Sequence, residues 1–169
     1  AFIWCWQQVS APYTFHLEDD WELILPVDLG EMIEVMNSNP WLAILRLPYR
    51  RSEAESQKNW SHFYHWNGQY FECPYDRKRE LGFCGHPSLI KSSFVWQTVP
   101  WLDPERNPEK QFHHGHPVLM NAVDNHYYGT WGKPGDEPYI RDTGREWMAR
   151  NGWAKSGLKA QFTRWEKVK

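Results

Sequence analysis

Three consecutive acidic residues, Glu18, Asp19 and Asp20, follow the aromatic and β-branched run Tyr13–Leu17. The alternation in that run predicts a strand. Adjacent carboxylates repel one another, and in open α/β sheets ligands bind at the carboxyl edge of the strands. Carboxylate oxygens at such an edge suit Mg²⁺ or Mn²⁺, which bind one or two carboxylates together with substrate phosphates. The alternative is a solvated acidic turn, and these residues alone leave both interpretations open.

The elements that position this acidic segment alternate between helix and strand. Residues 1–10 are typical of the end of a helix, and residues 13–17 of a strand. Asp28 is placed to cap a second helix, with Glu31 completing a capping box, and Pro40 stops that helix. An apolar run at 41–47 follows as a second strand. This order favours an α/β layer with some parallel pairing.

The rest of the chain is less regular, and the region 49–80 is polar and aromatic with little periodicity. We expect a long loop there with a hairpin at Asn67-Gly68, a strand at 81–85, a helix from Pro87 to about Val95, a helix at Pro108 capped by Asn107, a strand at 127–131 and a terminal helix bearing Leu158, Phe162 and Trp165. No internal repeat divides the chain, so we expect one domain over residues 1–169.

The composition excludes several classes of protein. The 169 residues carry 19 Lys and Arg against 21 Asp and Glu, so a broad basic surface for nucleic acid is not expected. No apolar stretch approaches the roughly 20 residues of a membrane-spanning helix. The three cysteines, Cys5, Cys73 and Cys84, show no CxxC spacing. That pattern favours free thiols in a reducing compartment, and we expect a cytoplasmic protein.

Several segments in one order carry a resemblance to a known family. They are Phe15–Trp21, Gly85–Ile90, Asn107–Phe112, Tyr128–Gly132, Asp136–Ile140 and Asp142–Gly144. Together they resemble motifs of GT-A glycosyltransferases, particularly the family-2-like enzymes common in bacteriophages and bacteria. The resemblance implies an α/β fold: a partial GT-A-like mixed sheet with flanking helices and long aromatic-rich loops. The chain begins one helix before the acidic motif, so we expect the catalytic, acceptor-side portion, with the nucleotide-binding half missing or supplied by a partner chain.

The resemblance also implies roles for individual acids. Asp20 is the expected metal ligand, and Glu18 and Asp19 are expected to contact the ribose of a nucleotide-sugar donor. Glu109 lies where the family has the catalytic base of inverting transfer, although a first-turn acid favoured by the helix dipole is the alternative. Asp142 falls where the family has a late histidine, and it is a second candidate ligand for Mn²⁺ or Mg²⁺. The metal would neutralise charge on the departing diphosphate.

The chain is rich in aromatic residues, with 12 Trp, 8 Tyr and 8 Phe. Because aromatic rings stack on sugars, Trp60, Trp66 and Trp101 are candidates for binding a glycan or other hydroxyl acceptor, with core packing as the alternative. The histidine-rich run 113–116 lacks a partner pair at zinc-ligand spacing, so a polar loop is the favoured interpretation.

The leading hypothesis is therefore a metal-dependent glycosyltransferase that transfers a sugar from a nucleotide-sugar donor to an acceptor hydroxyl. Two alternatives remain open from the residues. One is a metal-dependent phosphoesterase built on the same acids and the histidines, which requires two metal ions about 4 Å apart. The other is a non-catalytic glycan-binding fragment.

Overall fold

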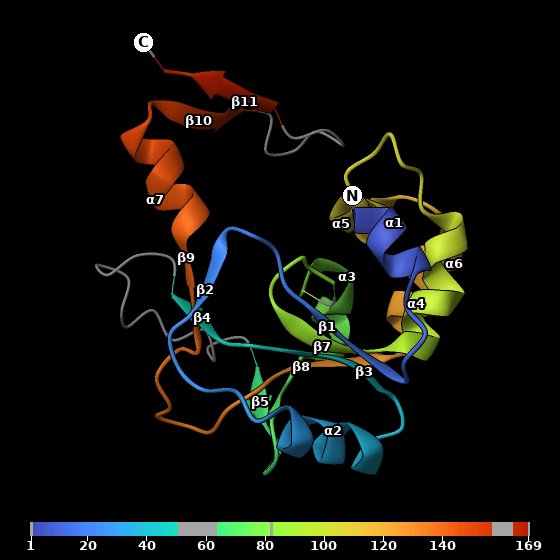
Figure 1. Cartoon of the computed structure of the whole chain (residues 1–169). Coiled ribbons are helices and arrows are strands. Elements are labelled where there is room, and N and C mark those ends of the chain that lie inside the picture. Colours follow the sequence, from blue (N-terminus) through green and yellow to red (C-terminus); the bar gives the residue numbers. More distant parts are fainter. Residues whose placement is uncertain (1, 51–63, 82, 157–163, 169) are drawn as a thin grey trace.

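The computed structural model describes residues 2–50, 64–81, 83–156 and 164–168. Its centre is a mixed six-stranded sheet with helices on both faces (Figure 1). In spatial order the strands are β1 (Tyr13–His16), β7 (Ser88–Lys91), β3 (Leu42–Arg46), β8 (Tyr127–Thr130), β6 (Phe71–Glu72) and β5 (His65–Trp66). The expected α/β class and mixed sheet with flanking helices are confirmed.

Strand β3 is the centre of this sheet and is buried along its whole length. It pairs in parallel with β8 and antiparallel with β7, which in turn pairs antiparallel with β1. A strand covered on both faces reads as a continuous apolar run, as residues 41–47 do. The predicted parallel pairing is therefore present between β3 and β8.

Two hydrophobic clusters cover the two faces of the sheet. On one face the cluster includes Trp6, Phe94 and Phe112, which come from different helices. The helices that contribute to this cluster are α1 (Phe2–Gln7), α4 (Ser92–Thr98), α5 (Pro108–His114) and α6 (Pro117–Asp124). On the other face, α2 (Leu29–Ser38) buries Met32 and Met36. The shorter helical pieces are η3 (Tyr75–Arg77), α3 (Lys78–Leu81) and η4 (Val99–Trp101).

A second sheet of three strands lies beside the first (Figure 1). Its order is β2 (Trp21–Leu23), β9 (Ile140–Asp142) and β4 (Tyr49–Arg50), and β9 leads into α7 (Thr143–Arg150). Beyond α7 the strands β10 (Trp153–Ser156) and β11 (Arg164–Lys167) form an antiparallel pair. The register of β2 and β9 sets Trp21 opposite Asp142, so the acidic segment lies next to a residue more than a hundred positions later.

Several local predictions are confirmed. The Asp28 side chain caps α2 by accepting a hydrogen bond from the Glu31 amide at 3.0 Å, and Asn107 caps α5 by accepting one from Lys110 at 3.1 Å. The expected hairpin at residues 67–68 joins β5 and β6. In the described part of the chain, no helix has both the length and the apolar character needed to cross a membrane.

Three predictions of secondary structure are wrong. The helix expected from Pro87 begins only at Ser92, and residues 88–91 form β7 because they pair with strands on both sides. No strand forms at 83–85, and Leu81 ends α3. The expected terminal helix is contradicted at 164–167, which form β11, while Leu158 and Phe162 lie outside the described residues.

Candidate functional site

Two of the predicted acids, Glu18 and Glu109, converge on Gly85. Glu18 lies in the turn between β1 and β2, whereas Glu109 lies in the first turn of α5. A Cβ atom placed on Gly85 would be 2.9 Å from Oε1 of Glu18 and 3.2 Å from Oε1 of Glu109. The Gly85 amide also donates a hydrogen bond to Oε1 of Glu109. The missing side chain of Gly85 therefore allows the two carboxylates to approach the same point.

Two further predicted acids, Asp20 and Asp142, meet at the start of α7, whereas Asp19 lies exposed in the same turn as Asp20. The Asp20 carbonyl accepts hydrogen bonds from the Thr143 amide at 2.9 Å, the Thr143 hydroxyl at 2.8 Å and the Gly144 amide at 3.3 Å. A Cβ atom on Gly144 would lie 2.6 Å from Oδ2 of Asp20. The acidic turn is thus fixed to the beginning of α7 by its backbone, with the Asp20 side chain packed over Gly144.

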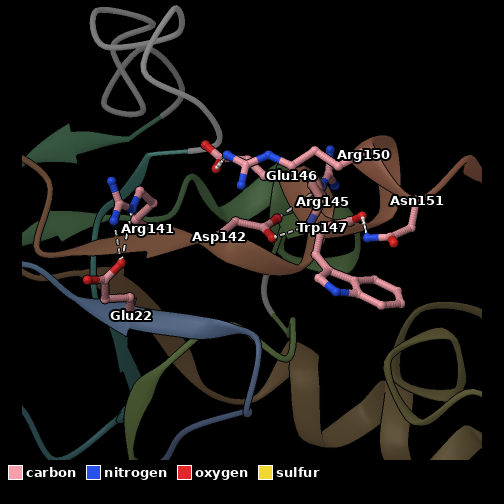
Figure 2. Close-up of polar contacts among 8 residues, drawn as sticks. All are labelled: Glu22, Arg141, Asp142, Arg145, Glu146, Trp147, Arg150 and Asn151. Carbon is pink, nitrogen blue, oxygen red and sulfur yellow. Dashed lines mark hydrogen bonds and ion pairs between the residues drawn. The ribbon is translucent and has the colours of Figure 1, made fainter.

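Asp142 is buried, and both oxygens of its carboxylate already contact Arg145 (Figure 2). Its Oδ1 caps α7 by accepting a hydrogen bond from the Arg145 amide at 3.0 Å, and its Oδ2 pairs with Nε of Arg145 at 3.0 Å. On the neighbouring strands, Arg141 binds Glu22 through two nitrogens. Asp142 therefore has a structural role in addition to its place beside Asp20.

Asp20 interacts electrostatically with the other acids of its turn and with Asp142. Desolvation raises the pKa of the Asp20 carboxyl, and the charges of Glu18 and Asp142, then that of Asp19, raise it further. Because like charges disfavour ionisation, a cation bound beside Asp20 would relieve this repulsion. We call Glu18, Asp20, Glu109 and Asp142 the acid cluster.

The acid cluster was tested for its fit to the metal that the resemblance implies. Among the residues that the structure describes, no group of three or more His, Cys, Asp or Glu side chains is arranged to hold a metal ion. A site made wholly by protein ligands is therefore not present in this part of the chain. Carboxylate oxygens do fit Mg²⁺ and Mn²⁺, which take one or two carboxylates and complete their shells with water and substrate phosphate.

A buried cation lies behind the acid cluster and was missed from the sequence. Arg46 ends β3, is only 6% exposed, and donates from one terminal nitrogen to Sγ of Cys84 at 2.9 Å and from the other to the Tyr64 hydroxyl. Burial opposes ionisation of the Cys84 thiol, but Arg46 and His86 lower its pKa to about 6, against an opposing contribution from Glu109. The signal in the sequence was an arginine inside an otherwise apolar strand.

Two of the tryptophans predicted to bind the acceptor, Trp66 and Trp101, lie on different elements, β5 and η4. Trp66 is on the edge strand β5, at the opposite edge of the sheet from β1, and packs on Phe71 with ring centroids 5.1 Å apart. Trp101 is half-exposed and stacks on His116 at 4.9 Å. Trp60 lies outside the described residues. These contacts are with residues outside the acid cluster, so an acceptor role for the tryptophans stays a prediction.

The histidines of 113–116 make contacts with the backbone. His113 binds the carbonyls of Arg79 and Phe83, and His116 caps α6 through a hydrogen bond from the Val118 amide at 3.2 Å. His113 and His114 end α5, so the expected polar loop is wrong for these two residues.

Comparison with known proteins finds no matching family model, no matching curated protein and no matching solved structure.

Proposed function

We propose that this chain carries the catalytic, acceptor-side part of a metal-dependent glycosyltransferase. The observation that supports the proposal is the convergence of the acid cluster. Its four members come from the β1–β2 turn, from α5 and from the end of β9. Glu18 and Asp142 raise the pKa of Asp20, and Glu18 and Glu109 both lie beside Gly85. The resemblance selected these acids from motif order alone, so their closeness in space is an independent argument in its favour.

In this proposal Asp20 and Asp142 hold Mn²⁺ or Mg²⁺, and Glu18 and Asp19 contact the donor ribose. When bound, the metal neutralises charge on the diphosphate of a nucleotide-sugar. The raised pKa of Asp20 fits this role, because a carboxylate repelled by its neighbours gains most from a nearby cation. The bonds from Asp142 to Arg145 orient its carboxylate toward the start of α7.

Glu109 is proposed as the base that takes the proton from the acceptor hydroxyl. The hydrogen bond from the Gly85 amide to Oε1 fixes the orientation of this carboxylate, and Glu109 is partly exposed in the first turn of α5. A carboxylate held in this way is able to accept a proton as the hydroxyl attacks the anomeric carbon. A base in this position is typical of inverting transfer.

Calorimetric titration of the whole chain with UDP and GDP, with and without Mn²⁺, tests the proposal. We expect nucleotide binding that requires Mn²⁺ and is lost in Asp20→Asn. Glu34→Gln is the matched control, since it removes an exposed carboxylate from α2, a helix that contributes no residue to the acid cluster. Its binding should equal that of the original chain.

Two results would contradict the proposal. One is metal binding that is indifferent to nucleotide; if it is accompanied by hydrolysis of p-nitrophenyl phosphate without any sugar, the phosphoesterase alternative is favoured. The other is nucleotide binding that Asp20→Asn leaves unchanged, because the acid cluster would then have no part in it.

A further inference from the structure

The buried charge of Arg46 requires a counter-charge. A guanidinium removed from water is costly unless an anion and hydrogen-bond acceptors surround it. Among the described residues, the polar side chains that Arg46 contacts are the Cys84 thiol and the Tyr64 hydroxyl, whose ring also lies under the guanidinium at 5.5 Å. One of these two groups is therefore expected to carry the negative charge.

The thiol is the better candidate of the two. An ordinary thiol loses its proton more readily than a phenol, and burial raises the pKa of Tyr64 further. His86 adds a second favourable neighbour for the sulfur, and Glu109 is the acidic group that opposes its ionisation. Cys84 as a residue is intermediate in exposure, whereas Cys73 is buried, so labelling of the native protein tests directly whether small reagents reach the sulfur.

Several buried polar atoms without hydrogen-bond partners lie on the face of the sheet that carries the Arg46 side chain. Ser88 is paired in register with Arg46 on one side and with His16 on the other, so the three side chains project from one face. The Ser88 hydroxyl is completely buried. Within the described part of the chain, this hydroxyl, Nε of Arg46 and Nε2 of His16 have no hydrogen-bond partner. Buried polar atoms of this kind indicate a place for an oxygen-bearing ligand or water.

We propose that Cys84, held as a thiolate by Arg46, is a redox modification site that reacts with hydrogen peroxide. The sulfur attacks one peroxide oxygen, an S–O bond forms, and the O–O bond breaks. The sulfur is oxidised by two electrons to a sulfenic acid, and the peroxide is reduced. The departing hydroxide takes a proton from solvent and leaves as water, and a thiol reductant restores the cysteine.

The consequence for the acid cluster rests on the proposed function. Cys84 directly precedes Gly85, whose amide orients Glu109, and the neighbouring Pro87 carbonyl accepts a hydrogen bond from the Leu47 amide at 2.9 Å. Oxidation adds an oxygen atom and removes the negative charge opposite Arg46. Since this segment is held on both sides, we expect oxidation to displace Gly85 and weaken metal-dependent nucleotide binding.

The first experiment measures the pH dependence of alkylation by iodoacetamide at each cysteine of the intact chain, with labelled peptides quantified by mass spectrometry. The pH midpoint of alkylation is compared, and not the absolute rate. A thiol with a lower pKa has more thiolate at a given pH, but each thiolate is less nucleophilic, so the two effects on the rate partly cancel. We expect a midpoint near pH 6 at Cys84. Cys5 is exposed and Cys73 is buried, where burial raises its pKa to about 11, so both are internal comparators.

Two variants separate charge from packing. Arg46→Met removes the positive charge and should move the alkylation midpoint of Cys84 toward that of an ordinary thiol, about 8.5. Arg46→Lys keeps a positive charge, so its midpoint should be lower than that of Arg46→Met. A midpoint at or above pH 8 in the original chain, or no labelling of Cys84 in the native protein, would overturn the proposal without any variant.

The second experiment treats the protein with hydrogen peroxide and traps sulfenic acid with dimedone. We expect an adduct at Cys84 that forms faster than the adduct at Cys5 and is lost when the oxidised protein is treated with dithiothreitol before dimedone is added. Equal rates at the two sites would count against the proposal. Nucleotide binding in the presence of Mn²⁺ should fall after oxidation and return with dithiothreitol. Unchanged nucleotide binding after complete oxidation would refute the regulatory consequence. Absence of nucleotide binding in the untreated protein would refute the proposed function, and the dimedone adduct at Cys84 would then still support the redox site.

Discussion

Replacing Asp142 by alanine or by asparagine separates its role in the helix from its role in the acid cluster. The side chain caps α7 and pairs with the half-exposed Arg145. Losing an N-cap costs about 1 kcal/mol, and losing a partly exposed ion pair costs about 0.5 kcal/mol. Asp142→Ala should therefore lower the free energy of unfolding by about 1.5 kcal/mol, which corresponds to roughly 3–6 °C in Tm for a chain of this size.

Asparagine caps helices about as well as aspartate. Asp142→Asn therefore keeps the hydrogen bond to the Arg145 amide and loses the ion pair. It also removes one of the charges that raise the pKa of Asp20, which acts in the opposite direction on stability. We expect its Tm to remain within about 2 °C of the original.

Thermal unfolding followed by circular dichroism without added metal measures both effects. Asp19→Asn, an exposed acid of the same segment, is the control and should change stability by less than about 0.5 kcal/mol. If Asn and Ala at position 142 destabilise equally, the cap is not what Asp142 contributes. With Mn²⁺ and nucleotide added, the original chain should gain Tm and Asp142→Asn should not, so a gain in both would remove Asp142 from the metal site.

Three further predictions follow from the packing and charges of the structure. Asp20→Asn should raise the free energy of unfolding at pH 7, as measured by urea unfolding. The pKa of Asp20 is raised in the folded state, so the stability of the original chain falls as pH rises from the ordinary pKa of 3.8 through the higher folded pKa. The gain in Asp20→Asn should therefore vanish below that pH window, and a loss of stability at pH 7 would contradict the reasoning. Gly85→Ala should weaken Mn²⁺-dependent nucleotide binding by displacing the two carboxylates beside it, as measured by calorimetry, and unchanged affinity would argue against their role. Phe112→Ala should cost about 3–5 kcal/mol in urea unfolding, because the ring is fully buried and stacks on Phe83 at 4.0 Å; a cost below about 1 kcal/mol would show that this core is not as tightly packed as described.

Short-range signals in the sequence were the most reliable. The caps at Asp28 and Asn107 each depend on a side chain and an amide three residues later, so the sequence contains both partners. Residues 88–91 were misassigned because their strand depends on β1 and β3, which lie more than forty residues away. Pro87 followed by a serine suggested a helix start, but pairing with two strands outweighed this local preference.

The acids of the candidate site were predicted because each lies in a short segment that resembles a motif of a known family. The acid cluster was selected in full, although its arrangement around Gly85 and Gly144 depends on the register between β2 and β9. The contact between Arg46 and Cys84 joins residues 38 positions apart, and neither residue type is unusual in isolation. Only the fold shows that the arginine is buried and that its neighbour is a thiol.

Gly85 and Gly144 give a last argument about the purpose of the acid cluster. Neither glycine has a left-handed backbone, so the need for glycine at these positions comes from space and not from conformation. Gly144 lies in the first turn of α7, where glycine costs roughly 0.5–1 kcal/mol relative to alanine inside a helix. In exchange, both positions leave room for carboxylates that repel one another. Folding alone gains nothing from holding acids that repel one another close together, and in the proposed function a bound cation would turn this repulsion into binding.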